Sequence, residues 1–128
     1  THPGTAGGLL LLSGSFFLDA YDGHESRFPH WARLRGFVDE VLESPYAGVT
    51  QPDSARLPIA LGWGTGEENR HNNVVMTARL QALGFPTVVA TRRDGHVFTC
   101  WRDLLDPLLP ELATAAWSVD RLCDRASA

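Results

Sequence analysis

Residues 57–96, LPIALGWGTGEENRHNNVVMTARLQALGFPTVVATRRDGH, hold the pattern that decides the fold. Two short apolar runs, 57–62 and 86–91, lie at the two ends of this stretch. Neither run alternates apolar with polar residues, which is typical of strands that are covered on both faces, as in a parallel sheet. Between them, apolar residues recur at helical spacing and Gly84 marks a helix end. These apolar residues are Met76, Leu80 and Leu83. The stretch therefore predicts a strand, a helix and a second strand.

The same pattern continues outward from this stretch. Residues 8–12 form another apolar run, and a helix is expected over about 28–42 or 31–42. The segment after Trp101 is also helical in its periodicity, with a break expected near Pro110, because proline suits the first turn of a new helix. The order strand, helix, strand, helix, strand, helix predicts an α/β fold, a parallel sheet with flanking helices.

The three predicted strands differ in how well they fit a covered sheet. The run 57–62 is the weakest, because Pro58 must lie at a strand start or at an edge. The run 8–12 reads as a covered strand, which needs neighbours on both sides, and only two other strands are available. We therefore expect residues 1–128 to be a single domain that is a piece of something larger.

The composition is that of one mildly acidic globular domain, with 44% hydrophobic residues and a formal net charge of -4. The longest apolar run is too short to span a membrane, and these residues contain no secretory signal, so a cytoplasmic location is expected. A pI near 5.6 argues against a nucleic-acid groove. The two cysteines, Cys100 and Cys123, are too few for a disulfide framework or a zinc knuckle. No cofactor, nucleic-acid partner or membrane partner is expected.

The strand exits carry the residues best suited to catalysis, since catalytic groups in open α/β sheets gather at the carboxyl ends of the strands. Glu67 and Glu68 follow a glycine-rich turn at the second exit. His96 follows Gly95, which is expected to turn the chain sharply, at the third exit. A loop histidine can take and return a proton near neutral pH. From spacing alone, two simpler interpretations stay open: acidic residues that complement a helix dipole, and a solvated histidine.

Other catalytic motifs do not fit these exits. Neither Ser13 nor Ser15 has the small flanking residues of a nucleophile elbow, and no G-x-S-x-G occurs in the sequence. Residues 62–66 lack the Gly-Lys-Ser/Thr ending of a phosphate loop and the spacing of a dinucleotide fingerprint. Either glutamate with His71 would place two metal ligands on a helix face, but no third ligand has supporting spacing. The sequence therefore predicts no metal site.

Residues 95–105, GHVFTCWRDLL, resemble the closing motif of an esterase family of α/β-hydrolases that includes the enterochelin (trilactone siderophore) esterases. The Gly-His and the Cys-Trp-Arg carry the likeness. Shorter segments are similar to the end of the family's nucleophile helix, the strand beyond it, and the acid-residue loop with its following helix: residues 2–3, 13–16, 64–69 and 72–80. Two positions depart from the family pattern. Asp94 stands where a second glycine is usual, and Val97 stands where Asp or Asn is common.

The resemblance implies a serine hydrolase that cleaves carboxylic esters, with a siderophore ester as the candidate substrate. His96 matches the catalytic histidine and Glu67 matches the acid best, with Glu68 as its rival. The nucleophilic serine would lie upstream of Thr1, and residues 1–128 would be a single domain that forms the C-terminal portion of a larger α/β-hydrolase catalytic domain. In the mechanism that this implies, the serine attacks the ester carbonyl, His96 accepts its proton, and the acid orients the imidazole. Trp101 and Arg102 would be neighbours of the site.

Two alternatives remain beside this interpretation. One is a non-catalytic α/β binding module that keeps the sheet without the chemistry. The other is an acyltransferase of the mycolyltransferase type, which shares the fold and a Glu-His pair. The expected partners are a small-molecule ester and either the missing N-terminal half or a second copy of the chain. The last expectation follows from the open edge that a partial sheet would expose.

Overall fold

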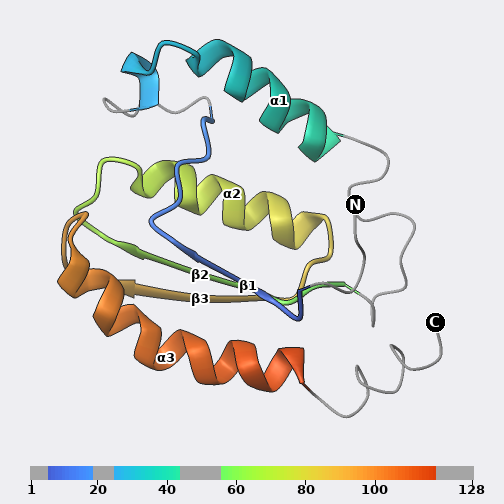
Figure 1. Cartoon of the computed structure of the whole chain (residues 1–128), viewed down its shortest axis with the longest axis vertical. Helices are drawn as coiled ribbons and strands as arrows, with labels where there is room; N and C mark the ends of the chain where they lie inside the picture. The colour runs from blue at the N-terminus through green and yellow to red at the C-terminus, as the bar shows by residue number, and fades with distance from the viewer. Residues whose placement is uncertain (1–5, 19–24, 44–55, 118–128) are drawn as a thin grey trace.

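The computed structural model of the protein describes residues 6–18, 25–43 and 56–117. In chain order its elements are β1 (Leu9–Leu12), η1 (Glu25–Arg27), α1 (Trp31–Glu43), β2 (Ile59–Gly64), α2 (Arg70–Ala82), β3 (Thr87–Arg92) and α3 (Phe98–Ala116) (Figure 1). The three strands lie where the apolar runs predict them. The first two α-helices also match their predicted ranges, and Gly84 follows α2 with a φ of 81°.

The strands form one parallel sheet in the order β1-β2-β3. Leu9 lies opposite Ile59 in the register, and Ile59 lies opposite Thr87. Helix α2 covers one face of the sheet, α3 covers the other, and α1 lies beyond α2 on the side away from the strands (Figure 1). This arrangement confirms the predicted α/β fold, a parallel sheet with flanking helices. None of the helices in the described ranges has the length and apolar character needed to cross a membrane.

The sequence placed Pro58 at a strand start or an edge, and it lies at the strand start, but the ranking of residues 57–62 as the weakest strand is wrong. β2, the run that Pro58 weakened, is the central strand and is buried along its whole length. Pro58 immediately precedes it and contributes only its carbonyl, which accepts a hydrogen bond from the Leu9 N–H at 3.0 Å. A proline at that position removes no donor from the ladder. β1, predicted as a covered strand, is instead a terminal strand of the described sheet, and none of its four residues is fully buried.

The side chains of β2 alternate between large and small, and this alternation sets the spacing of the two helix layers. Toward α2 the strand presents three large side chains, which pack with Leu80 and Phe85: Ile59, Leu61 and Trp63. Ala60 lies on the opposite face and packs with α3. On that face a Cβ added to Gly62 would lie only 2.8 Å from Leu108 Cδ1. The absence of a side chain at Gly62 therefore lets α3 lie directly on the strand.

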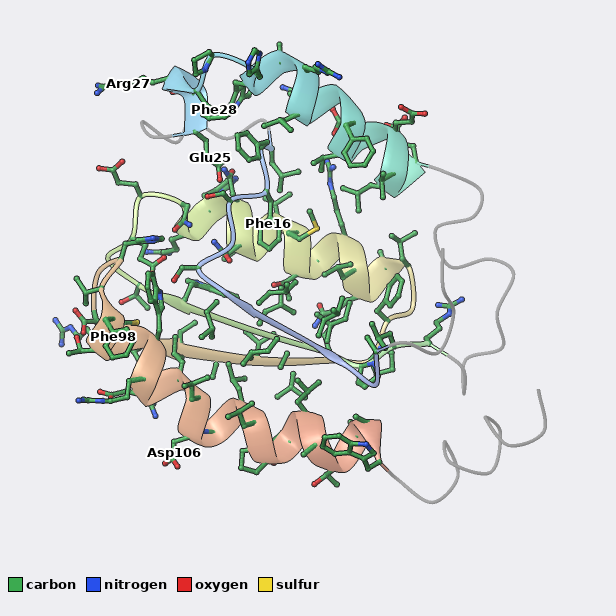
Figure 2. The ribbon with its side chains drawn as sticks, in the orientation of Figure 1. Phe16, Glu25, Arg27, Phe28, Phe98 and Asp106 are labelled. Carbon is green, nitrogen blue, oxygen red and sulfur yellow. The ribbon has the colours of Figure 1, made fainter. Side chains whose placement is uncertain are left out.

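Helix α3 runs without interruption from residue 98 to 116, so the predicted break near Pro110 is wrong. Pro107 lacks the N–H that would bond the Asp103 carbonyl, but Arg92 Nη2 donates to that carbonyl at 3.3 Å instead. Pro110 leaves the carbonyl of Asp106 without its helical donor, and Asp106 is an exposed residue that points away from the sheet (Figure 2). The remaining part of the predicted helical tail lies outside the described residues.

The continuous helix makes a testable difference between two adjacent leucines. Leu108 is fully buried against the sheet, whereas Leu109 is 47% exposed. Leu108→Ala should lower the free energy of unfolding by about 2–5 kcal/mol, because it leaves a cavity over Gly62. Leu109→Ala, the matched control, should change it by less than about 0.5 kcal/mol. Urea unfolding of both variants measures the difference, and equal losses would contradict this orientation of α3.

The segment before α1 is anchored to α2 by a buried carboxylate. Glu25 points from η1 toward α2 (Figure 2). Its Oε2 accepts hydrogen bonds from Asn72 Nδ2 at 2.8 Å and from the Phe17 N–H at 3.0 Å. Helix α1 itself has no fully buried residue and is joined to α2 by Arg79 and Asp39, whose charged atoms are 3.5 Å apart. The sheet, α2 and α3 therefore hold the residues that follow the strands, where the candidate catalytic side chains lie.

Candidate active site

The three predicted strand exits meet at the carboxyl edge of the sheet. Ser13 directly follows β1, Glu67 lies in the turn between β2 and α2, and His96 lies in the short loop between β3 and α3. Neighbouring parallel strands end at the same edge, so residues 83 positions apart in the chain are brought into one cluster. The hydrogen bonds described below connect all three residues.

Glu67 is a buried carboxylate whose two oxygens have different partners. Its side chain has no exposed surface. Oε1 accepts hydrogen bonds from the Gly64 N–H at 2.7 Å and from the Ser13 hydroxyl at 2.6 Å. Without such donors, burial of the carboxylate would lower the free energy of unfolding by several kcal/mol, because a charged group would lose its hydration and gain no hydrogen bond. Because Oε1 is occupied by these two donors, Oε2 is the oxygen that faces His96.

His96 lies against that second oxygen with an exposed ring. Its Nδ1 is 3.3 Å from Glu67 Oε2, and its side chain is 54% exposed. In neutral imidazole one nitrogen donates and the other accepts, so a carboxylate on Nδ1 selects the form with the proton on Nδ1. Nε2 is then the free acceptor, which is the form that a general base requires. The ring also meets the Trp101 ring edge-on, with centroids 5.1 Å apart.

Ser13 contributes to this cluster in a way that the sequence patterns missed, since they test it only as a nucleophile. It is 5% exposed and its hydroxyl donates to Glu67. Its φ is 50°, in the left-handed region where a serine is strained. Asn69 holds this conformation by donating to the Ser13 carbonyl at 2.9 Å, and Asn73 bonds both backbone groups of Gly14. The sequence feature that could have indicated Ser13 is its position directly after β1, the strand next to β2, which Glu67 follows.

The remaining predicted site residues lie around this cluster. Glu68 and His71 are exposed. The carboxylate that contacts His96 is that of Glu67. The described ranges contain no group of three side chains that could hold a metal ion. Trp101 is a neighbour of His96, as expected from the sequence. Arg102 pairs with Asp103 at 2.7 Å on the exposed side of α3.

Gly64, not Gly95, is the glycine on which this geometry depends. Gly95 was expected to permit a sharp turn, but Gly84 is the one described glycine with a positive φ, and a Cβ on Gly95 would meet nothing within 4 Å. The turn after β3 is stabilised instead by the side chain of Asp94, whose Oδ1 accepts the Gly95 N–H at 2.8 Å. A Cβ on Gly64 would lie 2.3 Å from the Asp94 carbonyl oxygen. The glycine therefore allows the turn after β2 to touch the loop that carries His96.

Cys100 lies below this cluster on the buried face of α3 and is 1% exposed. Burial, and then the negative charges of Glu67, Asp94 and Asp103, raise the pKa of its thiol. Because only the thiolate is nucleophilic, native Cys100 should react with iodoacetamide at neutral pH at least about tenfold more slowly than in the unfolded chain. The tryptic peptide 94–102 contains this cysteine alone, so mass spectrometry of that peptide measures the rate. Equal rates in the native and unfolded chain would contradict the burial of Cys100.

A cavity of about 470 Å³ is lined by Arg92, Arg102, Asp103 and Asp106. Both of its arginines are already engaged by Asp103, through its carbonyl and its carboxylate. The two positive charges are matched by two negative ones, which gives the cavity no preference for an anion. The Glu67–His96 pair is therefore the better candidate for chemistry.

Comparison with protein-family models, with curated protein sequences and with solved structures found no match for this chain.

Proposed function

We propose that this chain supplies the acid and the base of a serine ester hydrolase, with Glu67 as the acid, His96 as the base and the nucleophilic serine on residues that precede Thr1. One observation carries the proposal: a buried carboxylate contacts Nδ1 of a half-exposed histidine at the carboxyl edge of a parallel sheet. The likeness of residues 95–105 to the enterochelin-esterase family supports the same assignment. Within the pair, burial and contact with His96 favour Glu67 over Glu68.

The geometry allows a complete proton path for acyl transfer. The serine oxygen attacks the ester carbonyl while His96 Nε2 accepts the serine proton. Glu67 Oε2 accepts a hydrogen bond from Nδ1–H, stays ionised and stabilises the positive imidazolium. His96 then returns the proton to the departing alcohol, which leaves an acyl-enzyme. Water hydrolyses that ester with His96 again as the base, so the serine is regenerated and a carboxylic acid is released.

The substrate class in this proposal is a carboxylic ester, with a siderophore ester as the candidate drawn from the resemblance. The same acid and base would serve a transferase if an alcohol replaced water as the acyl acceptor. Product analysis separates the two activities, because a hydrolase releases the free acid and a transferase releases a new ester. The cytoplasmic location expected from the sequence stays a prediction, which fractionation of the native cells would test.

The test of the proposal is the intact mass of the native protein before and after treatment with a fluorophosphonate. We expect a mass above 14.0 kDa and one adduct, which peptide mapping should place on a serine outside residues 1–128. His96→Ala should prevent the labelling, since the serine then has no base. A native protein of 14.0 kDa that takes no adduct would contradict the proposal and favour a binding module. An adduct on Ser13 would contradict the proposal that the nucleophilic serine precedes Thr1.

A further inference from the structure

A chain of hydrogen bonds crosses the candidate site from α3 to the acid. The indole Nε1 of Trp101 donates to the Ser13 hydroxyl oxygen at 2.8 Å. The Ser13 hydroxyl in turn donates to Glu67 Oε1 at 2.6 Å. Trp101 and Ser13 are 88 positions apart in the sequence, and they come from the third and first strand exits. The acid between them belongs to the second exit, so the chain joins all three.

The direction of this chain is fixed by the chemistry of its members. An indole nitrogen can only donate, so the Ser13 oxygen must accept from Trp101. A hydroxyl has a single proton, and with the oxygen occupied by Trp101 that proton is directed at Glu67. The backbone of Ser13 cannot rotate to offer another arrangement. Its N–H donates to the Gly62 carbonyl at 2.7 Å, and its carbonyl accepts from Asn69 at 2.9 Å.

Trp101 also touches the other member of the pair. Its ring meets the His96 ring edge-on, with centroids 5.1 Å apart and planes at 89°. Such aromatic contacts favour one ring orientation over others. One side chain in the first turn of α3 therefore limits the rotation of the imidazole directly and, through Ser13, the rotation of the carboxylate.

We propose that Trp101 and Ser13 are positioning residues, which hold Glu67 so that Oε2 faces His96 Nδ1 and which thereby keep His96 in the form with Nε2 free. Neither residue forms a bond or transfers a proton in the proposed mechanism. Their catalytic importance rests on the proposed function, whereas their effect on the histidine does not. Ser13 acts on the carboxylate directly and Trp101 acts through Ser13, so the loss of Ser13 is the more damaging change.

The experiment measures the tautomer of His96 in the native protein by long-range ¹H–¹⁵N correlation at alkaline pH. In the unaltered chain we expect the Nδ1–H form to predominate. Ser13→Ala and Trp101→Phe should both shift the population toward Nε2–H, with the larger shift in Ser13→Ala. Trp101→Phe keeps an aromatic ring at this position but removes the indole N–H together with part of the ring volume. Trp63→Phe is the matched control, because it makes the same loss of ring volume and N–H at a buried tryptophan that packs on the opposite face of β2. It should leave the tautomer unchanged.

The same variants in the native protein provide the kinetic test. We expect kcat for ester hydrolysis to fall by about tenfold to a hundredfold, with KM unchanged, since orientation and not binding is lost. An unchanged tautomer and an unchanged kcat in both variants would overturn the positioning role while the proposed function stands. A shifted tautomer in a protein that hydrolyses no ester would support the positioning role and count against the proposed function. A tautomer that Trp63→Phe shifts equally would assign the effect to general packing and overturn the proposal.

Discussion

Glu67→Gln should lower kcat for ester hydrolysis by about 10³–10⁴-fold in the native protein, with little change in KM. The two donors on Oε1 decide which way the new amide points. Gly64 N–H and the Ser13 hydroxyl both require an acceptor at that position, so the amide oxygen must occupy it. The amide NH₂ group then faces His96 Nδ1 and forces that nitrogen to be the acceptor. Nε2 consequently carries the proton and cannot take one from a serine.

The matched control is the adjacent residue. Glu68→Gln makes the same chemical change on an exposed residue of the same turn, and kcat should stay within about twofold of the unaltered protein. Urea unfolding of both variants shows whether the fold is retained, and hydrolysis of a p-nitrophenyl ester measures kcat. A loss of activity in Glu68→Gln with Glu67→Gln unaffected would reverse the assignment of the acid. A loss of similar size in both would point to a general effect of charge on the turn.

The parts of the fold that local pattern controls could be predicted from the sequence. Apolar runs of four to six residues located all three strands, and 3.6-residue periodicity located α1 and α2. The order of burial among the strands could not be predicted, because it depends on which strand the chain places in the middle. Pro58 counted against β2 in the sequence, yet in the structure it only precedes the first paired residue. The predicted break at Pro110 is wrong: α3 continues through it, and the residue whose carbonyl Pro110 leaves without its helical donor, Asp106, is exposed. At Pro107 a side chain from β3, that of Arg92, donates to the freed carbonyl.

The candidate site was predictable in outline and not in detail. Topology alone indicates that Glu67 and His96 follow neighbouring strands, so their proximity could be expected. The choice between Glu67 and Glu68 could not, since adjacent residues in a turn differ only in the direction of their side chains. The Gly64 N–H and the Ser13 hydroxyl make that choice in the structure. The Ser13 contact joins positions 54 residues apart, the Gly64 contact lies within one turn, and neither leaves a periodic signal in the sequence.

Gly64→Ala should destabilise the fold by about 3 kcal/mol and should also separate Glu67 from His96. The new methyl carbon would lie 2.3 Å from the Asp94 carbonyl oxygen, 2.9 Å from the Asp94 carbonyl carbon and 3.0 Å from Glu67 Oε1. Two of these three atoms belong to the backbone, so no side-chain rotation can relieve the overlap. The loop after β3 must move as a whole, and His96 moves with it.

A glycine in the loop after β3 provides the control for Gly64→Ala. A Cβ on Gly95 meets nothing within 4 Å and its φ is not positive, so Gly95→Ala should change the free energy of unfolding by no more than about 1 kcal/mol. Urea unfolding compares the stabilities, and the His96 tautomer reports whether the contact with Glu67 survives. If the two changes destabilise the fold equally, the close approach of Gly64 to the Asp94 carbonyl is not the reason that Gly64→Ala is unfavourable. A stable Gly64→Ala variant with the Nδ1–H form intact would show that the two turns do not touch, and the geometry that joins the acid to the base would have to be abandoned.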